Sequence, residues 1–148
     1  MIRDTFNFRN STYEPSWLYG GAFGLRKHYF GPKPGDFRER RLDNSLTEVF
    51  QCAQYRDDLK EIQFWVRNLS RKRTSFRLQT STDWFYPDFV CQLTDGRVLV
   101  VEYKGSHLIA DSAEKATVGA VWAGRSAGQC LFVMPSDLDL QSISEAIR

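Results

Sequence analysis

Residues 86–105 read YPDFVCQLTDGRVLVVEYKG, and two apolar runs in this stretch flank an Asp-Gly pair. Short apolar runs separated by Asp-Gly are typical of two antiparallel strands joined by a tight turn. We therefore expect strands at 85–93 and 97–103. Asp88 lies near the start of the first strand and Glu102 near the end of the second, so the pairing of these strands decides whether the two carboxylates meet.

The loop length decides which face of the sheet each charged side chain takes. Side chains alternate between the faces of a strand, so Glu102 and Lys104 share one face and Tyr103 lies on the other. A two-residue loop would place Asp88 opposite Tyr103, away from Glu102. A three-residue loop over 94–96, with its glycine in the left-handed region, places Asp88 opposite Glu102.

The three-residue loop also pairs the apolar residues with one another. Val90 then faces Val100, and Phe89 faces Val101. Glu102 is kept off the face of Phe89 and Val101, where a carboxylate would be poorly solvated. Because a one-residue slip would reverse these faces, burial and site chemistry both predict the three-residue loop.

Asp88, Glu102 and Lys104 would together suit a divalent cation and a phosphate ester. Mg²⁺ binds few protein carboxylates and keeps several waters and substrate oxygens. A bound Mg²⁺ would polarise a phosphoryl oxygen and acidify a water. Lys104 would orient that water, act as a general base, or stabilise charge on the phosphorus. The alternative interpretation is an exposed cross-strand charge cluster without a catalytic role.

Upstream of this stretch the pattern changes from helical to extended. Apolar residues recur at helical spacing after Asn44 and Ser45, which predicts a helix at about 45–60. Alternating apolar residues predict a strand at 61–68 and a returning strand at 75–80. The basic residues Arg71, Lys72 and Arg73 would form the turn between these two strands.

Downstream, Asp111 and Glu114 form a capping-box pattern that begins a helix. The alanines at 113, 116, 120 and 123 give this helix a small-residue face that would lie close to a sheet. A short strand is expected at 130–134 and a last helix from Asp137. The order helix, four strands, helix, strand, helix predicts an α/β fold, in which helices flank a central mixed sheet of antiparallel hairpins with one parallel crossover.

Residues 1–44 show no clear period and are rich in Gly, Pro, Asn and aromatic residues. Gly and Pro mark turns, so we expect an irregular N-terminal arm with one short strand near 27–30. The number of aromatic residues predicts that the arm packs on the core. The domain organisation expected is thus an arm at 1–44 and a folded domain at 45–148.

Composition limits the class of protein. The 148 residues are 42% hydrophobic and 26% charged, as expected of one soluble domain. The longest strongly apolar run, 98–101, is too short to span a bilayer. The chain has no apolar leader and three widely spaced cysteines, which favours a reducing, cytoplasmic location without a disulfide framework. The absence of a CxxC pair and the two isolated histidines argue against a structural zinc site.

The positive charge is concentrated in the first part of the chain. Residues 1–80 carry 15 Lys and Arg against 9 Asp and Glu, whereas residues 81–148 carry 5 against 9. Six cations surround the first expected hairpin, and with Trp65 they would follow a nucleic-acid backbone; they are Lys60, Arg67, Arg71, Lys72, Arg73 and Arg77. The alternative is a basic surface that only aids solubility.

Pro87-Asp88 followed by Glu102-Tyr103-Lys104 resembles the PD-(D/E)xK nuclease superfamily, whose core is helix, three strands, helix, strand. Longer runs are similar to the endonuclease region at the C-terminus of type III restriction enzyme restriction subunits. These runs are FWVRNL at 64–69, FYPDFV at 85–90, DGR at 95–97 and VEYKG at 101–105, and the likeness continues in Glu114, Lys115 and Trp122. The resemblance covers about 46–134 and implies a restriction-endonuclease-like core.

The resemblance implies Mg²⁺-dependent endonucleolytic hydrolysis of DNA in a prokaryotic cytoplasm, with Mn²⁺ able to substitute. Asp88 and Glu102 would be metal ligands, and Lys104 the catalytic lysine. The backbone carbonyl of Tyr103 would be a further ligand. Many members carry another glutamate in the first helix, for which Glu48 is the candidate. A surface glutamate is the alternative, because Glu48 lies away from the apolar face of that helix.

The restriction subunits carry an ATP-driven motor, but this chain has no GxxxxGK[ST] loop and no DExH-like box, so we expect no ATP site in it. The expected partners are DNA, and a helicase or translocase region and a modification subunit of a restriction–modification system. Two alternatives stay open. One is a non-catalytic nucleic-acid-binding or assembly module that keeps the nuclease fold, and the other is a nuclease acting on RNA or single strands.

Overall fold

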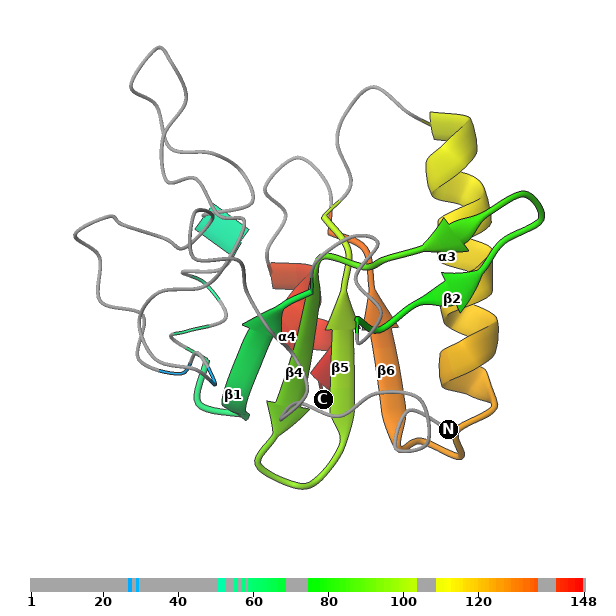
Figure 1. The fold of residues 1–148 in the computed structure, drawn as a ribbon. Coiled ribbons are helices and arrows are strands. Elements are labelled where there is room, and N and C mark those ends of the chain that lie inside the picture. Colours follow the sequence, from blue (N-terminus) through cyan, green and yellow to red (C-terminus); the bar gives the residue numbers. More distant parts are fainter. Residues whose placement is uncertain are drawn as a thin grey trace, which may run out of the picture.

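The computed structural model (Figure 1) describes residues 59–68, 75–103, 109–135 and 141–147, together with Lys27, Tyr29, Gln51, Cys52, Tyr55 and Asp57. For residues 109–111 only the backbone is described. The expectations for the remainder of the N-terminal arm, and for Glu48, Arg71, Lys72, Arg73 and Lys104, lie outside the described residues.

A four-stranded mixed sheet forms the centre of the fold. Its order is β1 (Ile62–Arg67), β4 (Phe89–Leu93), β5 (Val98–Val101) and β6 (Cys130–Val133). The pairs β1–β4 and β4–β5 are antiparallel, and β5–β6 is parallel. Helix α3 (Ile109–Gly124) connects the parallel pair. The predicted α/β arrangement, a central mixed sheet flanked by helices, is confirmed.

Both faces of the sheet are covered. One face packs against α4 (Gln141–Ile147), which lies behind the strands in Figure 1, and the other against α3 and a small hairpin. Phe89 and Val101 belong to the first cluster, and Val90 and Val100 to the second. Since β4 and β5 are buried on both faces, their apolar residues run almost without interruption.

The expected pairing of 61–68 with 75–80 is wrong. β1 pairs with β4, while β2 (Leu78–Gln79) and β3 (Trp84–Phe85) form a separate two-stranded hairpin. β4 is apolar on both faces and suits the buried position beside β1, whereas the region of β2 alternates with polar side chains. The expected strand 85–93 is divided into β3 and β4 by Pro87, which lacks the N–H that a sheet requires.

Helix α3 differs from the expectation at its start. It begins at Ile109, before Asp111, so Asp111 is not the cap that the sequence predicted. Glu114 takes another role, because its Oε1 accepts a 2.7 Å hydrogen bond from the backbone N–H of Ser81. The carboxylate therefore ties the turn of the β2–β3 hairpin to the helix.

The face that α3 turns to the sheet also differs from the expectation. Ala113, Ala116 and Ala120 are exposed, so the alanine face is not the buried one. The helix packs on β6 through Gly119, which is buried. A Cβ on this glycine would lie 2.4 Å from the ring of Phe132, closer than real atoms approach. The close approach that the alanines predicted is made one residue away, by the glycine.

Within the helix predicted at about 45–60, the structure describes Gln51, Cys52, Tyr55 and Asp57 as helical. Two residues of the arm, at the place of its expected strand, lie beside β1. The N–H of Tyr29 donates to the carbonyl of Trp65, and the N–H of Trp65 donates to the carbonyl of Lys27, each at 2.9 Å. The described part of the arm thus packs on the sheet.

The cysteines agree with the expectation from their number and spacing. Cys52, Cys91 and Cys130 are buried free thiols, so they form no disulfide. Across the described ranges, no helix has the length and apolar character needed to cross a bilayer.

Candidate active site

The β4–β5 loop has the register that the sequence predicted. Leu93 N–H donates to the Arg97 carbonyl at 2.9 Å, which leaves residues 94–96 as a three-residue loop. Gly96 has a φ of 93°, the left-handed conformation required at that position. Because Phe89 pairs with Val101, the residues just beyond each strand, Asp88 and Glu102, lie opposite each other.

Two backbone hydrogen bonds join these acidic residues. The N–H of Asp88 donates to Oε1 of Glu102 at 3.1 Å. The N–H of Tyr103 donates to Oδ2 of Asp88 at 2.8 Å. Each carboxylate therefore accepts a hydrogen bond from the strand end that carries the other, which fixes both side chains at the same corner of the sheet.

Each carboxylate also has a cationic partner. Nη1 of Arg67 lies 2.9 Å from Oδ1 of Asp88, and Nζ of Lys115 lies 3.3 Å from Oε2 of Glu102. The side chains of Asp88 and Glu102 are 19% and 12% exposed. β1 thus supplies one cation and α3 the other, and both pairs lie mostly away from water.

The protonation of Glu102 is strongly perturbed. Burial, and next the negative charge of Asp88, raise the pKa of Glu102 from 4.5 to about 8. The positive charge of Lys115 acts in the opposite direction but does not cancel these effects. Two close carboxylates resist simultaneous ionisation, so burial and the charge of Asp88 together favour the protonated form of Glu102.

The donor set fits a hard divalent cation. Asp88 and Glu102 offer four carboxylate oxygens. Each of these oxygens accepts one of the hydrogen bonds given above, so each keeps a further lone pair for a metal ion. Among the described residues, no group of three or more His, Cys, Asp and Glu is placed to hold a metal ion. A two-carboxylate site matches Mg²⁺, which completes its shell with water and substrate oxygens.

The other residues expected at this site are partly described. The side chain of Tyr103 packs with Val101 on the face opposite Glu102, as the alternation predicted. Its N–H donates to Oδ2 of Asp88, and its carbonyl stays a predicted ligand. Lys104 and Glu48 lie outside the described residues.

Asn68 supports the site, and sequence reasoning missed it. This buried side chain donates from Nδ2 to the carbonyls of Phe76 and Pro87, both at 2.8 Å, and accepts from the N–H of Phe76 at 2.9 Å. Its backbone N–H donates to the Asp88 carbonyl at 2.8 Å. Asn68 therefore fixes the segment that leads into Asp88. A polar residue just after a buried strand was the available signal.

Of the cations expected to bind nucleic acid, the structure describes Lys60, Arg67 and Arg77, and these three lie apart. Arg67 turns inward to Asp88 and lies over the ring of Phe89, 5.3 Å from its centroid. Lys60 is exposed before β1, at the opposite end of the strand from Arg67. Arg77 is exposed beside β2. Of the expected group, the structure places only Arg67 at Asp88, while Arg71, Lys72 and Arg73 are outside the described residues.

The aromatic residue expected among those cations is a core residue instead. Trp65 is fully buried, and its Nε1 donates to Oδ1 of Asp57 at 3.2 Å. Among the tryptophans that the structure describes, Trp84 on β3 is the exposed one. The guanidinium carbon of Arg77 lies over the Trp84 ring, 4.1 Å from its centroid. Arg77 therefore lies beside an aromatic residue that the sequence analysis did not single out.

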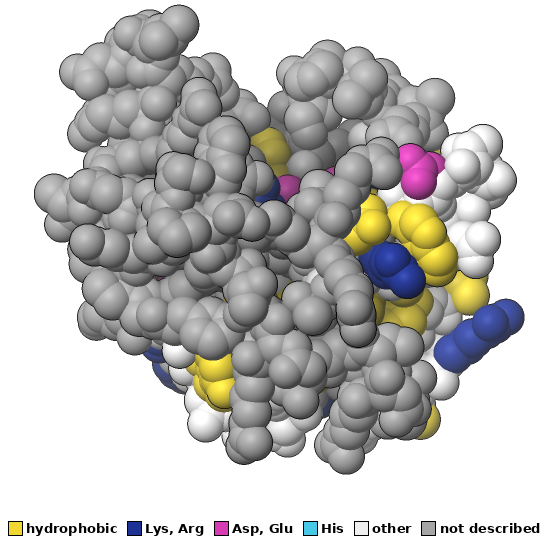
Figure 2. Space-filling view, viewed as in Figure 1, with side chains coloured by type: hydrophobic (Ala, Val, Ile, Leu, Met, Phe, Trp, Pro, Cys, Tyr) yellow, Lys and Arg dark blue, Asp and Glu magenta, His cyan; other side chains and the backbone are white. Residues whose placement is uncertain are grey.

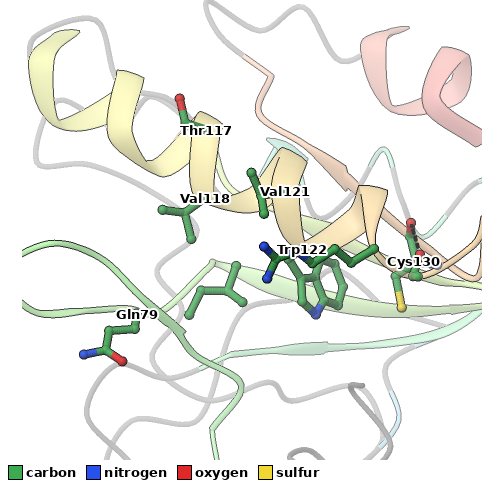
Figure 3. Close-up of a pocket in the computed structure, with 9 residues that line it drawn as sticks. Gln79, Thr117, Val118, Val121, Trp122 and Cys130 are labelled. Carbon is green, nitrogen blue, oxygen red and sulfur yellow. Dashed lines mark hydrogen bonds between the residues drawn. The ribbon is translucent and has the colours of Figure 1, made fainter.

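A cavity of about 480 Å³ lies between the hairpin and α3. Its lining combines apolar side chains such as those of Val118 and Trp122 (Figure 3) with Arg125, which follows the last residue of α3. The described lining residues are Leu78, Gln79, Thr117, Val118, Val121, Trp122, Arg125, Ser126 and Cys130. The cavity is lined by the later turns of α3, whereas Lys115 contacts Glu102 from an earlier turn.

No protein-family model, curated protein or solved structure matches the chain.

Proposed function

We propose that the chain is a Mg²⁺-dependent DNA endonuclease of the PD-(D/E)xK type with a restriction-endonuclease-like core. The chain order supports this proposal: the helical residues Gln51, Cys52, Tyr55 and Asp57 come first, then β1, β4, β5, α3 and β6, with the β2–β3 hairpin as an insertion. Asp88 precedes the second strand of that core and Glu102 follows the third, as in the sequence pattern that the superfamily shares.

The observation that carries the proposal is the hydrogen-bonded pair of Asp88 and Glu102. Their opposed positions bring two buried carboxylates to one corner of the sheet. Burial of two acidic groups together is unfavourable unless a cation or a proton compensates. A divalent ion that also binds a phosphate oxygen would supply that compensation.

The residues have distinct roles in the proposed reaction. Asp88 and Glu102 would hold Mg²⁺, with the Tyr103 carbonyl as a further ligand and Glu48 as a candidate. When bound, Mg²⁺ supplies polarisation of the phosphoryl oxygen and acidification of a water. Lys104 would orient the attacking water, take its proton, or stabilise charge on the phosphorus.

Arg67 and Lys115 would position the two carboxylates. Arg67 also donates from Nη1 to the Asp88 carbonyl at 2.8 Å, so it fixes both the main chain and the side chain of that residue. Nζ of Lys115 lies 5.2 Å from the centroid of the Phe85 ring, which places this cation between the hairpin and Glu102.

We propose that the chain works within a type III restriction-like system in a prokaryotic cytoplasm. A helicase or translocase region and a modification subunit would then be its partners, and Mn²⁺ would replace Mg²⁺. Because the sequence contains no phosphate-binding loop, cleavage by this chain alone should not depend on ATP.

A second candidate function is a non-catalytic nucleic-acid-binding or assembly module. The ion pairs of Arg67 with Asp88 and of Lys115 with Glu102 favour it, because a protein cation already accompanies each carboxylate. A nuclease acting on RNA or single strands would use the same site residues, so the substrate tests separate it from a DNA endonuclease.

Plasmid nicking tests the proposal. The purified chain should nick supercoiled DNA with Mg²⁺ or Mn²⁺, stop when a chelator is added, and be indifferent to ATP. Activity should fall steeply with salt, because binding rests on contacts with phosphates. Asp88→Asn and Glu102→Gln should abolish nicking. Absence of nicking by a folded chain that still binds DNA would favour the non-catalytic module, and cleavage confined to RNA would favour the RNA nuclease.

A further inference from the structure

The β2–β3 hairpin has an inner and an outer face. Leu78 pairs with Phe85 and Gln79 with Trp84, so these two pairs project to opposite sides. Phe85 is buried, and its ring lies 6.1 Å from that of Phe132 on β6. Trp84 is 41% exposed. The inner pair thus attaches the hairpin to the core, and the outer pair faces solvent.

Arg77 lies on this outer face. It is exposed, and its guanidinium makes no ion pair within the part of the chain that the structure describes. Its guanidinium carbon lies over the Trp84 ring, 4.1 Å from the centroid, so Arg77 covers one face of the ring in a cation–π contact and a base would stack on the opposite face. On the face drawn in Figure 2, Lys or Arg side chains lie against hydrophobic ones where Figure 1 places β2 and α3.

The position of Trp84 is held by its own turn. The Trp84 N–H donates to Oδ1 of Asp83 at 2.7 Å, and the Thr80 N–H donates to the Asp83 carbonyl at 2.9 Å. The Ser81 N–H is bound to Glu114 of α3. A fixed aromatic ring with a cation beside it is what single-stranded nucleic acids stack on, because every base has a flat face and every nucleotide carries a phosphate.

This outer face is close to the candidate active site. Trp84 and Asp88 are four residues apart, and an extended chain spans at most about 3.6 Å per residue. Successive phosphates of one strand rise about 3.4 Å each in B-form DNA. A base stacked on Trp84 would therefore lie within about four nucleotides of a phosphate at Asp88.

The cavity of about 480 Å³ adjoins this hairpin. It is lined by Leu78 of the inner face as well as Gln79 of the outer face, together with Trp122 and Arg125. A recess of this size with apolar walls and a few polar groups is typical of small-ligand sites.

We propose that the outer face of the β2–β3 hairpin binds an unpaired nucleotide within about four nucleotides of the scissile phosphate, with its base stacked on Trp84 and its phosphate bound by Arg77. The inference rests on the proposed nuclease function and specifies its substrate as a strand with an unpaired or extruded base. Bases inside a duplex stack on one another and offer only their edges, so a tryptophan ring reaches their faces only when they are unpaired.

Oligonucleotide binding tests the inference without cleavage. The probes are a fluorescein-labelled 12-nucleotide DNA strand of mixed sequence and the corresponding blunt duplex, measured by anisotropy with chelator present. Trp84→Ala should weaken binding of the single strand about 5- to 150-fold, the range that stacking of one base implies. It should change duplex affinity less than about twofold, and Trp84→Phe should retain most of the single-strand affinity.

Charge is tested separately. Arg77→Ala should weaken binding of the single strand. It should also lower the magnitude of the slope of log affinity against log salt concentration by about 0.7, the value for one phosphate contact on a single strand. Arg97→Gln is the matched control, because it removes one positive charge beside the β4–β5 loop, at the end of the strands away from Asp88. This control should keep the wild-type salt slope.

The outcomes separate the inference from the proposed function. Mg²⁺-dependent nicking together with unchanged single-strand binding in Trp84→Ala would overturn the inference and leave the nuclease. Equal losses for single strand and duplex would also overturn it, because the effect would then not be stacking. A selective loss of single-strand binding in a chain that cannot nick would support base stacking on Trp84 and refute the nuclease.

Discussion

The backbone N–H of Asp88 donates a 3.1 Å hydrogen bond to Oε1 of Glu102, so the two acidic residues of the candidate site are joined directly across the ends of β4 and β5. This contact exists because the loop between the strands has three residues and not two. It brings together two mostly buried carboxylates. The burial of Glu102, and next the negative charge of Asp88, are the physical basis of the first two predictions.

The stability of the protein should fall as pH rises toward alkaline values. Burial and Asp88 raise the pKa of Glu102 to about 8. Between pH 4.5 and about pH 8 the folded chain therefore keeps a proton on Glu102 that the unfolded chain has released. This stabilisation of the folded state is complete below pH 4.5 and is lost as the pH rises through about 8. Urea unfolding at pH 5, 7 and 9 should show a decrease of on the order of a few kcal/mol.

Glu102→Gln tests the origin of this slope. The neutral amide keeps an acceptor for the Asp88 N–H but cannot ionise, so the pH dependence of the variant should be much flatter. Glu145→Gln removes a carboxylate from an exposed position on α4 and serves as the matched control. Parallel pH profiles for wild type and Glu102→Gln would show that Glu102 does not cause the slope.

Mg²⁺ should raise the melting temperature, and more at pH 8.5 than at pH 6. Metal and proton compete for Glu102, so binding strengthens as the carboxylate ionises. A ligand at 100 times its Kd stabilises the folded state by about 2.7 kcal/mol. Asp88→Asn and Glu102→Gln should each lose most of the thermal shift. An equal shift in wild type and Asp88→Asn would place the bound Mg²⁺ elsewhere.

The site could be predicted from sequence because its determinants are local. The Asp-Gly pair, the alternation of apolar residues and the penalty for a carboxylate on the apolar face all lie within residues 86–105. Together they select the loop, and the loop determines that Asp88 meets Glu102. The α/β class could be predicted in the same way, because the apolar residues of the expected helices and strands recur at clear helical or alternating spacings.

The features that were missed depend on contacts between segments distant in the sequence. β1 pairs with β4 and not with 75–80 because burial on both faces favours the more apolar strand, a comparison that adjacent residues do not show. Gly119 and not the alanine face meets β6, since the rotation of α3 depends on the whole helix–sheet interface. Trp65 is buried on β1 of the central sheet, whereas Trp84 is exposed on the separate β2–β3 hairpin, a difference that depends on the sheet order.

Lys104→Ala should separate catalysis from metal binding. Lys104 follows Glu102 by two residues, and we assign it to the attacking water or the phosphorus and not to the metal. Loss of a general acid–base group lowers rates by about 10²- to 10⁴-fold. Plasmid nicking by Lys104→Ala should fall by this order, while its Mg²⁺-induced thermal shift should stay at the wild-type value. Wild-type nicking by this variant would refute the role given to Lys104.

Gly119→Ala should destabilise the protein although alanine is the better helix former. The new Cβ would lie 2.4 Å from the Phe132 ring, so α3 must move away from β6. Overpacking of this kind costs about 1–3 kcal/mol, against a gain of about 1 kcal/mol in helix propensity. Gly124→Ala is the matched control, because its Cβ would meet no atom within 4 Å. Equal urea midpoints for the two variants would mean that α3 does not approach β6 as described.

Asn68→Ala should destabilise the fold and also weaken the Mg²⁺ response, because Asn68 is the buried link between β1 and the segment that enters Asp88. Removing its side chain leaves the N–H and carbonyl of Phe76 and the carbonyl of Pro87 without these partners. Unsatisfied buried groups of this kind cost about 2–4 kcal/mol in total.

Urea unfolding and the Mg²⁺ thermal shift measure the two effects of Asn68→Ala separately. Gln63→Ala, at an exposed position on β1, is the control and should change stability by less than about 0.5 kcal/mol. If Asn68→Ala were as stable as this control, the hydrogen bonds of the Asn68 side chain would not stabilise the fold as described. Because Asp88→Asn should lose the Mg²⁺ response at little cost in stability, a combined loss in Asn68→Ala would distinguish a residue that positions Asp88 from one that binds the ion.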